Sequence, residues 1–195
     1  MTTYVLERKS DVNLLTLSSP DGINRLQLAA VCRLYETIRD LAEQQPALPL
    51  IITGNQKFFS VGADLNEIGA LSATYAVQFS RTGQKFTDAL DNFPALTIAA
   101  ISGYCMGGAM DLALACDVRI AAPNAVFGHR GAALGILTGW GGTQRLPRLI
   151  GKAHTLQMFL AAEMVSAEEA RRIGLVNELA DDPVSAALEK AKGKS

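Results

Sequence analysis

Two short segments of the chain place glycines where an extended stretch passes into a helix, a pattern that can bind an oxygen atom. They are residues 58–65 (FFSVGADL) and 103–112 (GYCMGGAMDL). Glycine allows positive φ angles and close backbone approach, and the first N–H groups of a helix lack internal partners and lie at its positive end. One N–H from each segment, directed at a single carbonyl oxygen, would form an oxyanion hole that stabilises an enolate. Glycine-rich turns also serve packing alone, and the residues by themselves leave that alternative open.

Two side chains near the second segment have the chemistry to move protons beside such a hole. Asp111 follows the glycine pair at 107–108, and His129 lies in the later segment 127–135 (FGHRGAALG). A histidine there would suit general acid or base chemistry near neutral pH. The alternatives are a loop histidine with an ordinary hydrogen bond, a carboxylate at Asp111 that the helix dipole stabilises, and a helix-capping role for Asp64.

The motifs and the composition exclude several classes of function. There is no Gly-x-x-x-x-Gly-Lys-Ser/Thr phosphate loop, no Gly-x-Gly-x-x-Gly dinucleotide motif, and no Gly-x-Ser-x-Gly nucleophile turn. Two histidines, and three cysteines without paired spacing, predict no metal site. Lys and Arg number 18 and Asp and Glu number 19, so a net charge of −1 favours neither nucleic acid nor an anionic membrane as partner. The most apolar region, residues 95–122, is interrupted by charges and predicts buried core, not a membrane helix.

The elements that must position these residues alternate between short strands and helices. This order predicts one α/β domain over residues 1–195 with a mostly parallel sheet. The start of the chain lacks the basic and apolar regions of a signal peptide, and the odd number of cysteines fits free thiols in a reducing cytoplasm. The patterns predict strands at 12–17, 50–53, 96–101, 117–121 and 126–127, and helices at 26–41, 74–90, 107–116, 143–150, 153–161, 166–172 and from 183 onward.

Four blocks of the chain together resemble the enoyl-CoA hydratase/isomerase (crotonase) family. They are residues 57–65, 99–121, 139–151 and 166–177, and they match in order and spacing over nearly the whole chain. The resemblance implies a crotonase-like spiral of strand-strand-helix units that assembles as a homotrimer or hexamer. It also implies an acyl-CoA thioester as substrate, whose oxygen is bound by the backbone N–H groups of Ala63 and Gly108. Lys57, Ala63 and Asp64 would then lie near the CoA, which enters as part of the substrate, and no metal or redox cofactor is implied.

The sequence departs from this family at the residues that activate water. Hydratases of the family carry two glutamates; the first position here holds the shorter Asp111, and the second holds Gly131. A shift of about 1 Å in a catalytic group can cost about a hundredfold in rate. We therefore expect a lyase of the enoyl-CoA hydratase/isomerase type, with Asp111 and His129 as its acid–base candidates and with ordinary two-carboxylate hydration in doubt.

Two alternatives to a hydratase remain open at this point. One is a decarboxylase or isomerase variant, because both reactions need a stabilised enolate but not two carboxylates. The other is a non-catalytic relative that binds acyl-CoA or only assembles with other subunits. The chain also stops soon after Val176, where relatives continue through several more C-terminal helices, so we expect a short member with an open acyl pocket.

Overall fold

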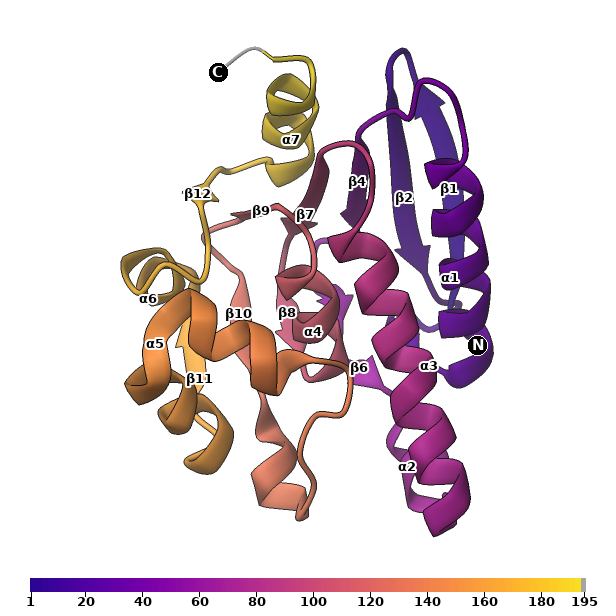
Figure 1. The fold of residues 1–195 in the computed structure, drawn as a ribbon. Coiled ribbons are helices and arrows are strands. Elements are labelled where there is room, and N and C mark those ends of the chain that lie inside the picture. Colours follow the sequence, from indigo (N-terminus) through magenta and orange to yellow (C-terminus); the bar gives the residue numbers. More distant parts are fainter. Residues whose placement is uncertain (194–195) are drawn as a thin grey trace.

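The backbone of this protein repeats one unit, which consists of a strand, a shorter second strand and a helix (Figure 1). The computed structural model describes residues 1–193. The first strand of each unit joins a six-stranded sheet and the second joins a smaller sheet, which confirms the spiral of strand-strand-helix units. In chain order the elements are β1 (Thr3–Lys9), β2 (Val12–Ser18), β3 (Arg25–Leu26), α1 (Leu28–Ala42), β4 (Leu50–Thr53), β5 (Phe58–Ser60), β6 (Gly62–Ala63), α2 (Leu65–Gly69), α3 (Ala73–Asp91), β7 (Thr97–Ile101), β8 (Tyr104–Met106), α4 (Gly108–Leu114), β9 (Val118–Ala121), β10 (Val126–Gly128), the 3-10 helix η1 (Arg130–Leu134), α5 (Gly142–Leu160), β11 (Met164–Ser166), α6 (Ala167–Arg172), β12 (Glu178–Leu179) and α7 (Pro183–Ala191).

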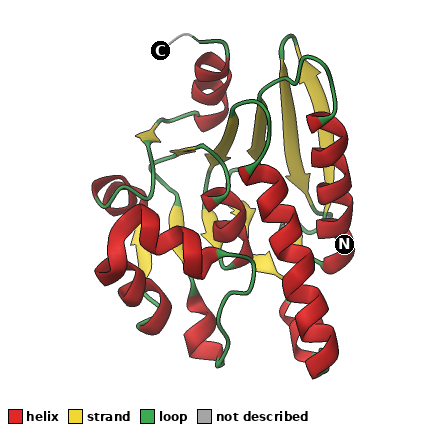
Figure 2. Ribbon diagram, viewed as in Figure 1, coloured by secondary structure: helices red, strands yellow, loops and turns green. Residues whose placement is uncertain are grey.

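The six-stranded sheet has the order β1-β2-β4-β7-β9-β12, and every neighbouring pair except β1 and β2 is parallel. Its side chains alternate between two apolar layers. Leu50 and Ile52 of β4 enter the larger core, whereas Ile51 packs on the opposite face with Ala187 of α7. Aliphatic residues on both faces are typical of a parallel sheet that is covered on both sides, and Figure 2 shows the helices around it. The predicted mostly parallel sheet is confirmed.

The smaller sheet positions the candidate functional residues. Its order is β11-β10-β8-β5, with β8 parallel to both β5 and β10. After each of these parallel strands the chain turns toward a helix: through β6 into α2, directly into α4, and through η1 into α5. Because parallel strands end at the same edge of a sheet, the three turns lie side by side, and the Gly107 N–H donates to the Gly128 carbonyl oxygen at 2.9 Å. This is the edge at which parallel sheets commonly bind ligands.

The helices largely follow the predicted ranges, with one difference in α5. The two helices predicted at 143–150 and 153–161 form one element that is broken at Gly151, where φ is 78°. Strand β1 was not predicted from the sequence, because most of its side chains are exposed and apolar alternation is weak. No helix in the described part of the chain is both long and apolar enough to cross a membrane.

Candidate active site

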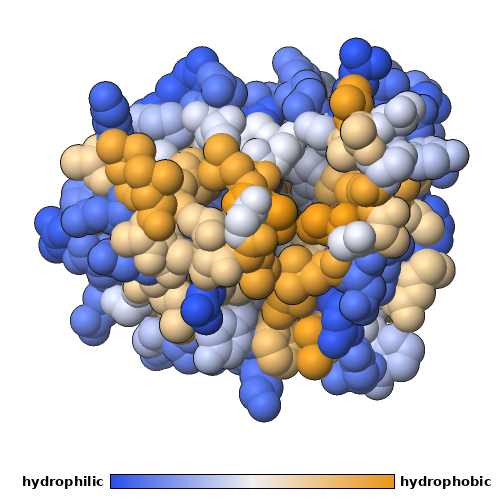
Figure 3. Space-filling view, turned by 90° about the horizontal axis from the view of Figure 1, so that it is seen from below, coloured by the Kyte–Doolittle hydropathy of each residue, from blue (hydrophilic) through white to orange (hydrophobic). Residues whose placement is uncertain are grey.

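A cavity of about 340 Å³ opens where the three strand-to-helix turns meet. Its walls come from the segment around α2, from α3, from the start of α4, and from the stretch between β10 and α5. Figure 3, seen from the end of the molecule where α2 lies, shows apolar side chains around this hollow. A cavity of this size and apolar character is typical of a small-molecule site. The apolar residues of its lining include Leu65, Ile68, Leu71, Phe79, Met106, Leu134, Ile136, Leu137 and Trp140.

The structure brings Ala63 and Gly108 to the same part of the cavity wall. Ala63 ends β6 and Gly108 begins α4, and both line the cavity. Gly62 joins the two turns closely, because a Cβ atom there would stand 2.7 Å from the Gly108 nitrogen, and its φ of +81° is one that glycine adopts readily. As the first residue of α4, Gly108 has an N–H without a partner in the helix. Ala63 and Gly108 therefore line one wall of the cavity, and an oxyanion hole formed by their N–H groups stays a prediction.

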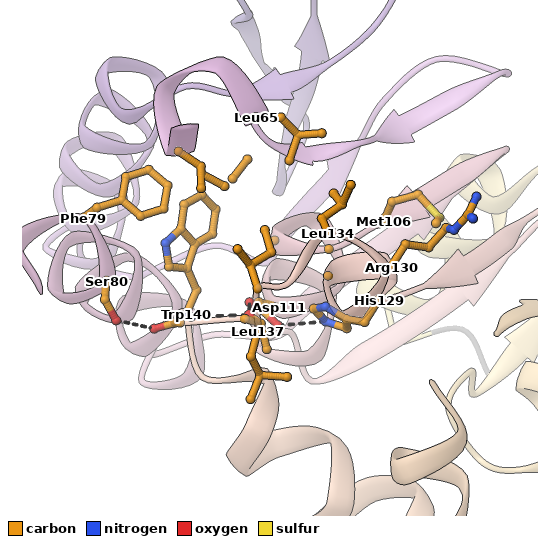
Figure 4. Close-up of a pocket in the computed structure, with 18 of the residues that line it drawn as sticks. Leu65, Phe79, Ser80, Met106, Asp111, His129, Arg130, Leu134, Leu137 and Trp140 are labelled. Atoms are coloured by element: carbon orange, nitrogen blue, oxygen red, sulfur yellow. Dashed lines mark hydrogen bonds and ion pairs between the residues drawn. The ribbon is translucent and has the colours of Figure 1, made fainter. Parts of the chain in front are cut away.

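Asp111 and His129, which are distant in sequence, meet at the base of this wall (Figure 4). Asp111 lies in the first turn of α4 with no exposed surface, and His129 directly follows β10 with 4% exposure. The Asp111 Oδ1 atom is 3.2 Å from His129 Nε2, which is within ion-pair distance, although the angle does not make it an aligned hydrogen bond. The His129 ring packs edge-on against Phe159, with 4.8 Å between ring centroids. Asp111 is thus both a helix-entry carboxylate and a partner of His129.

The two carboxylate oxygens of Asp111 have different surroundings, because Oδ2 accepts a hydrogen bond whereas Oδ1 has only the close contact with His129. The Thr138 hydroxyl donates to Oδ2, and Oδ1 faces His129 Nε2. The other ring nitrogen of His129, Nδ1, makes no hydrogen bond with a described residue. Unlike Nε2, it is not one of the fully buried atoms that lack a hydrogen-bond partner. This arrangement places a carboxylate beside an imidazole that can exchange protons with a bound molecule.

Gly131, at the position where the resemblance implies a second glutamate, lines the cavity. A Cβ atom there would stand 2.6 Å from the Ile136 carbonyl oxygen, and the Ile136 N–H donates to the Gly131 oxygen at 3.0 Å. The turn after η1 therefore fills the space that a side chain at residue 131 would need. Within residues 1–193, Asp111 is the one acidic side chain that lines the cavity.

The two other sequence-predicted site residues lie away from this pair. Asp64 caps α2, because its Oδ1 accepts a hydrogen bond from the Asn66 N–H at 2.9 Å, so the capping interpretation is confirmed. Lys57 is exposed, with Nζ 6.0 Å from the centre of the Phe58 ring, and it does not line the cavity. A contact between either residue and CoA stays a prediction.

Most of the cavity lining was not predicted from the sequence, including Thr138, Trp140 and Phe79. Thr138 and Trp140 lie 27 and 29 residues after Asp111, so no local periodicity connects them with the site. A large aromatic residue among three glycines, at 139–142, is the one signal that pointed to Trp140.

The buried thiol of Cys105 lies near the site but is poorly suited to act as a nucleophile. Burial and the nearby Asp111 carboxylate raise its pKa well above the ordinary thiol range, so it stays neutral. The described residues also hold no group of three or more His, Cys, Asp or Glu side chains arranged to bind a metal ion.

The chain is similar to curated proteins that act on enoyl-CoA thioesters. Residues 7–191 match the family model described as Enoyl-CoA hydratase/isomerase. The chain is 38% identical over 176 residues to a crotonyl-CoA hydratase of Syntrophomonas wolfei subsp. wolfei, covering 90% of this chain and 68% of the relative. It is 37% identical over 179 residues to a 2,3-dehydroadipyl-CoA hydratase of Escherichia coli, covering 92% of this chain and 69% of the relative.

Solved structures show the same fold. Pseudomonas aeruginosa DspI matches with a TM-score of 0.94 at 37% identity, covering 98% of this chain and 74% of that one. An enoyl-CoA hydratase from Bacillus anthracis matches with a TM-score of 0.92 at 31% identity, covering 98% of this chain and 76% of that one. The fold implied by the sequence blocks is therefore confirmed over nearly all of the chain.

Proposed function

The chain belongs to the enoyl-CoA hydratase/isomerase family, and on that premise we propose that it hydrates an enoyl-CoA thioester through a single Asp–His pair. The observation that carries this proposal is the 3.2 Å contact of Asp111 with His129 in the same cavity as Gly108. The proposed reaction requires no cofactor beyond the CoA of the substrate.

The oxyanion hole would hold the thioester oxygen. The N–H groups of Ala63 and Gly108 donate to it, and the negative charge that develops when the enolate forms is stabilised there. Loss of one such donor in an enzyme costs on the order of 10²–10³ in kcat. A preorganised pair of backbone donors therefore supplies a large part of the expected rate enhancement.

His129 would move the protons of the reaction, with Asp111 as the residue that orients it. In hydration, the oxygen of water adds to Cβ of the enoyl group while His129 takes one of its protons. The enolate then receives a proton from His129 at Cα, so atoms and charge balance over the cycle. Because one group both accepts and returns the proton, water and proton add to the same face of the double bond.

Isomerisation of the double bond is the second candidate, and the absence of any acidic lining side chain besides Asp111 among residues 1–193 favours it. In that reaction His129 removes a proton from one carbon of the acyl chain and returns it to another through the same enolate. No water is activated, so one acid–base group is sufficient.

The test is the loss of enoyl-thioester absorbance from crotonyl-CoA, measured for the wild type, Asp111→Asn and His129→Gln. We expect the wild type to hydrate and both variants to lose at least a hundredfold in kcat. A 3-enoyl-CoA substrate and exchange of the Cα proton of butyryl-CoA in D₂O are measured in parallel. Exchange without hydration would replace hydratase by isomerase. Turnover that neither variant alters would refute the role of the pair.

Assembly as a homotrimer or hexamer is part of the same proposal, and it is supported by the resemblance to the family alone. Light scattering coupled to size-exclusion chromatography measures it directly. A monomer at the concentration of the activity assay would refute it.

A further inference from the structure

Trp140 closes the inner end of the cavity. Only 2% of its surface is exposed, whereas leucines at the cavity rim, such as Leu65 and Leu137, are 57% and 58% exposed. Figure 4 shows the Trp140 ring between Phe79 and Asp111, and the two aromatic ring centroids are 5.3 Å apart. The cavity thus has an apolar and exposed rim and a buried aromatic floor.

Two glycines on different helices make room for the indole. A Cβ atom on Gly83 of α3 would stand 2.0 Å from Trp140 Cδ1, and one on Gly108 of α4 would stand 2.6 Å from Cζ3. Neither glycine has a positive φ. The space that the indole needs, and not the backbone conformation, therefore explains why glycine is present at both positions. The ring is therefore fixed between α3 and α4 and fills the space between them.

Hydrogen bonds hold the backbone at this position against α3. The Thr87 hydroxyl donates to the Trp140 carbonyl oxygen at 2.8 Å, and the Ser80 hydroxyl donates to the Gly139 oxygen at 2.8 Å. The floor is consequently anchored to the helix that also carries Phe79. A rigid floor limits what the cavity can hold, because packed interiors leave few spaces for extra atoms.

We propose that Trp140 sets the maximum length of the acyl chain that this protein accepts. The inference rests on the proposed function, because the Gly108 peptide that would bind the thioester oxygen lies directly against the indole. An acyl chain that starts there lies beside the indole, which closes the way toward Gly83, so the space left in the cavity limits its length. Replacement of the indole by a smaller side chain extends the cavity toward Gly83.

Binding of saturated acyl-CoA thioesters, from butyryl-CoA to dodecanoyl-CoA, measures this limit by calorimetry without turnover. Each methylene that becomes buried lowers Kd about fourfold. In the wild type we expect this gain to stop at a defined chain length. In Trp140→Ala the gain continues to longer chains. Trp140→Phe gives an intermediate chain-length limit. The buried indole Nε1 has no hydrogen-bond partner among the described residues. Since Trp140→Phe removes this atom and keeps an aromatic ring, it is the variant expected to fold without difficulty.

Gly83→Ala provides the matched control. The three atoms nearest to its new Cβ all belong to the Trp140 indole, so the substitution displaces the ring and shortens the limit. In the Trp140→Ala background the same change has no ring to displace and should leave the limit where it is. Leu137→Ala, at the exposed rim, should not move the limit if the chain points to the floor.

The two hypotheses fail in different ways. A limit that stays at one chain length in all Trp140 variants, or that moves in Leu137→Ala instead, would overturn the role of Trp140 and leave the proposed function standing. Acyl-CoA binding no tighter than that of free CoA in the wild type would overturn the proposed function and this inference together.

Discussion

Thr138→Val is the substitution that tests the organisation of the Asp111 site most directly. It removes one hydroxyl and keeps the branched shape of the side chain. That hydroxyl donates to Asp111 Oδ2 and also lies 3.5 Å from the Trp140 N–H as an acceptor. Since Asp111 has no exposed surface, water cannot replace the lost donor without a rearrangement.

The magnitude follows from the charge and burial of Asp111. A hydrogen bond to a charged group contributes about 1.5–3 kcal/mol, and a domain of this length loses about 2–4 °C in Tm per kcal/mol. Thr138→Val should therefore lower Tm by about 3–12 °C. If Asp111 orients His129, kcat should also fall by on the order of 10–100-fold with little change in KM, because Thr138 acts through Asp111.

The assay compares Thr138→Val with Thr138→Ser, which keeps the hydroxyl, in both the wild-type and the Asp111→Ala backgrounds. Coupled residues give nonadditive effects in such a cycle. The valine variant should cost stability and activity in the wild-type background and almost nothing once Asp111 is absent. Equal costs in the two backgrounds would refute the argument that Thr138 acts on Asp111.

Gly131→Glu introduces the family's second carboxylate, but we expect it not to increase the rate of crotonyl-CoA hydration. Its Cβ would stand 2.6 Å from the Ile136 carbonyl oxygen, so the substitution should destabilise the protein by about 1–3 kcal/mol. A faster hydration rate would contradict this. Burial raises the pKa of Cys116 from 9.0 to about 12. The unfolded chain therefore loses this proton before the folded protein does, and stability should fall by about 1.4 kcal/mol per pH unit between pH 9 and 12, a slope that denaturant titrations should find reduced in Cys116→Ala. Asp182 caps α7, and its hydrogen bond with the Ser185 hydroxyl lowers its pKa. Asp182→Ala should cost about 0.5–2 kcal/mol at neutral pH, and the difference from wild type should shrink as the pH falls below the ordinary value of 3.8; a difference that persists in acid would refute the charged cap.

Local structure, such as turns, helix caps and strands, could be predicted from the sequence alone. Glycines at two strand-to-helix junctions predicted the turns before the helices that begin at Leu65 and Gly108, because helix starts and glycine turns depend on neighbouring residues. The capping role of Asp64 was predicted for the same reason and is confirmed by its bond with the Asn66 N–H. Short apolar runs likewise predicted the main parallel strands, since a strand that is buried on both faces consists of consecutive apolar residues.

The resemblance to a family added what local pattern does not contain. It implied the spiral of strand-strand-helix units, which the sheet order confirms. It also showed that residue 131 lacks the expected carboxylate, but the sequence did not show whether another side chain replaces it. The structure shows that the turn to Ile136 occupies that space.

The sequence by itself determined the residue types at the site and the local turns that expose them. Only the tertiary structure decided that Asp111 would meet His129 and Thr138, which follow it by 18 and 27 residues, and that Trp140 would fit between Gly83 and Gly108. The physical reason is the range of the interactions. Periodicity, capping and turn preference arise within a few residues, whereas a buried carboxylate acquires its partners only when separate helices and strands pack into one interior.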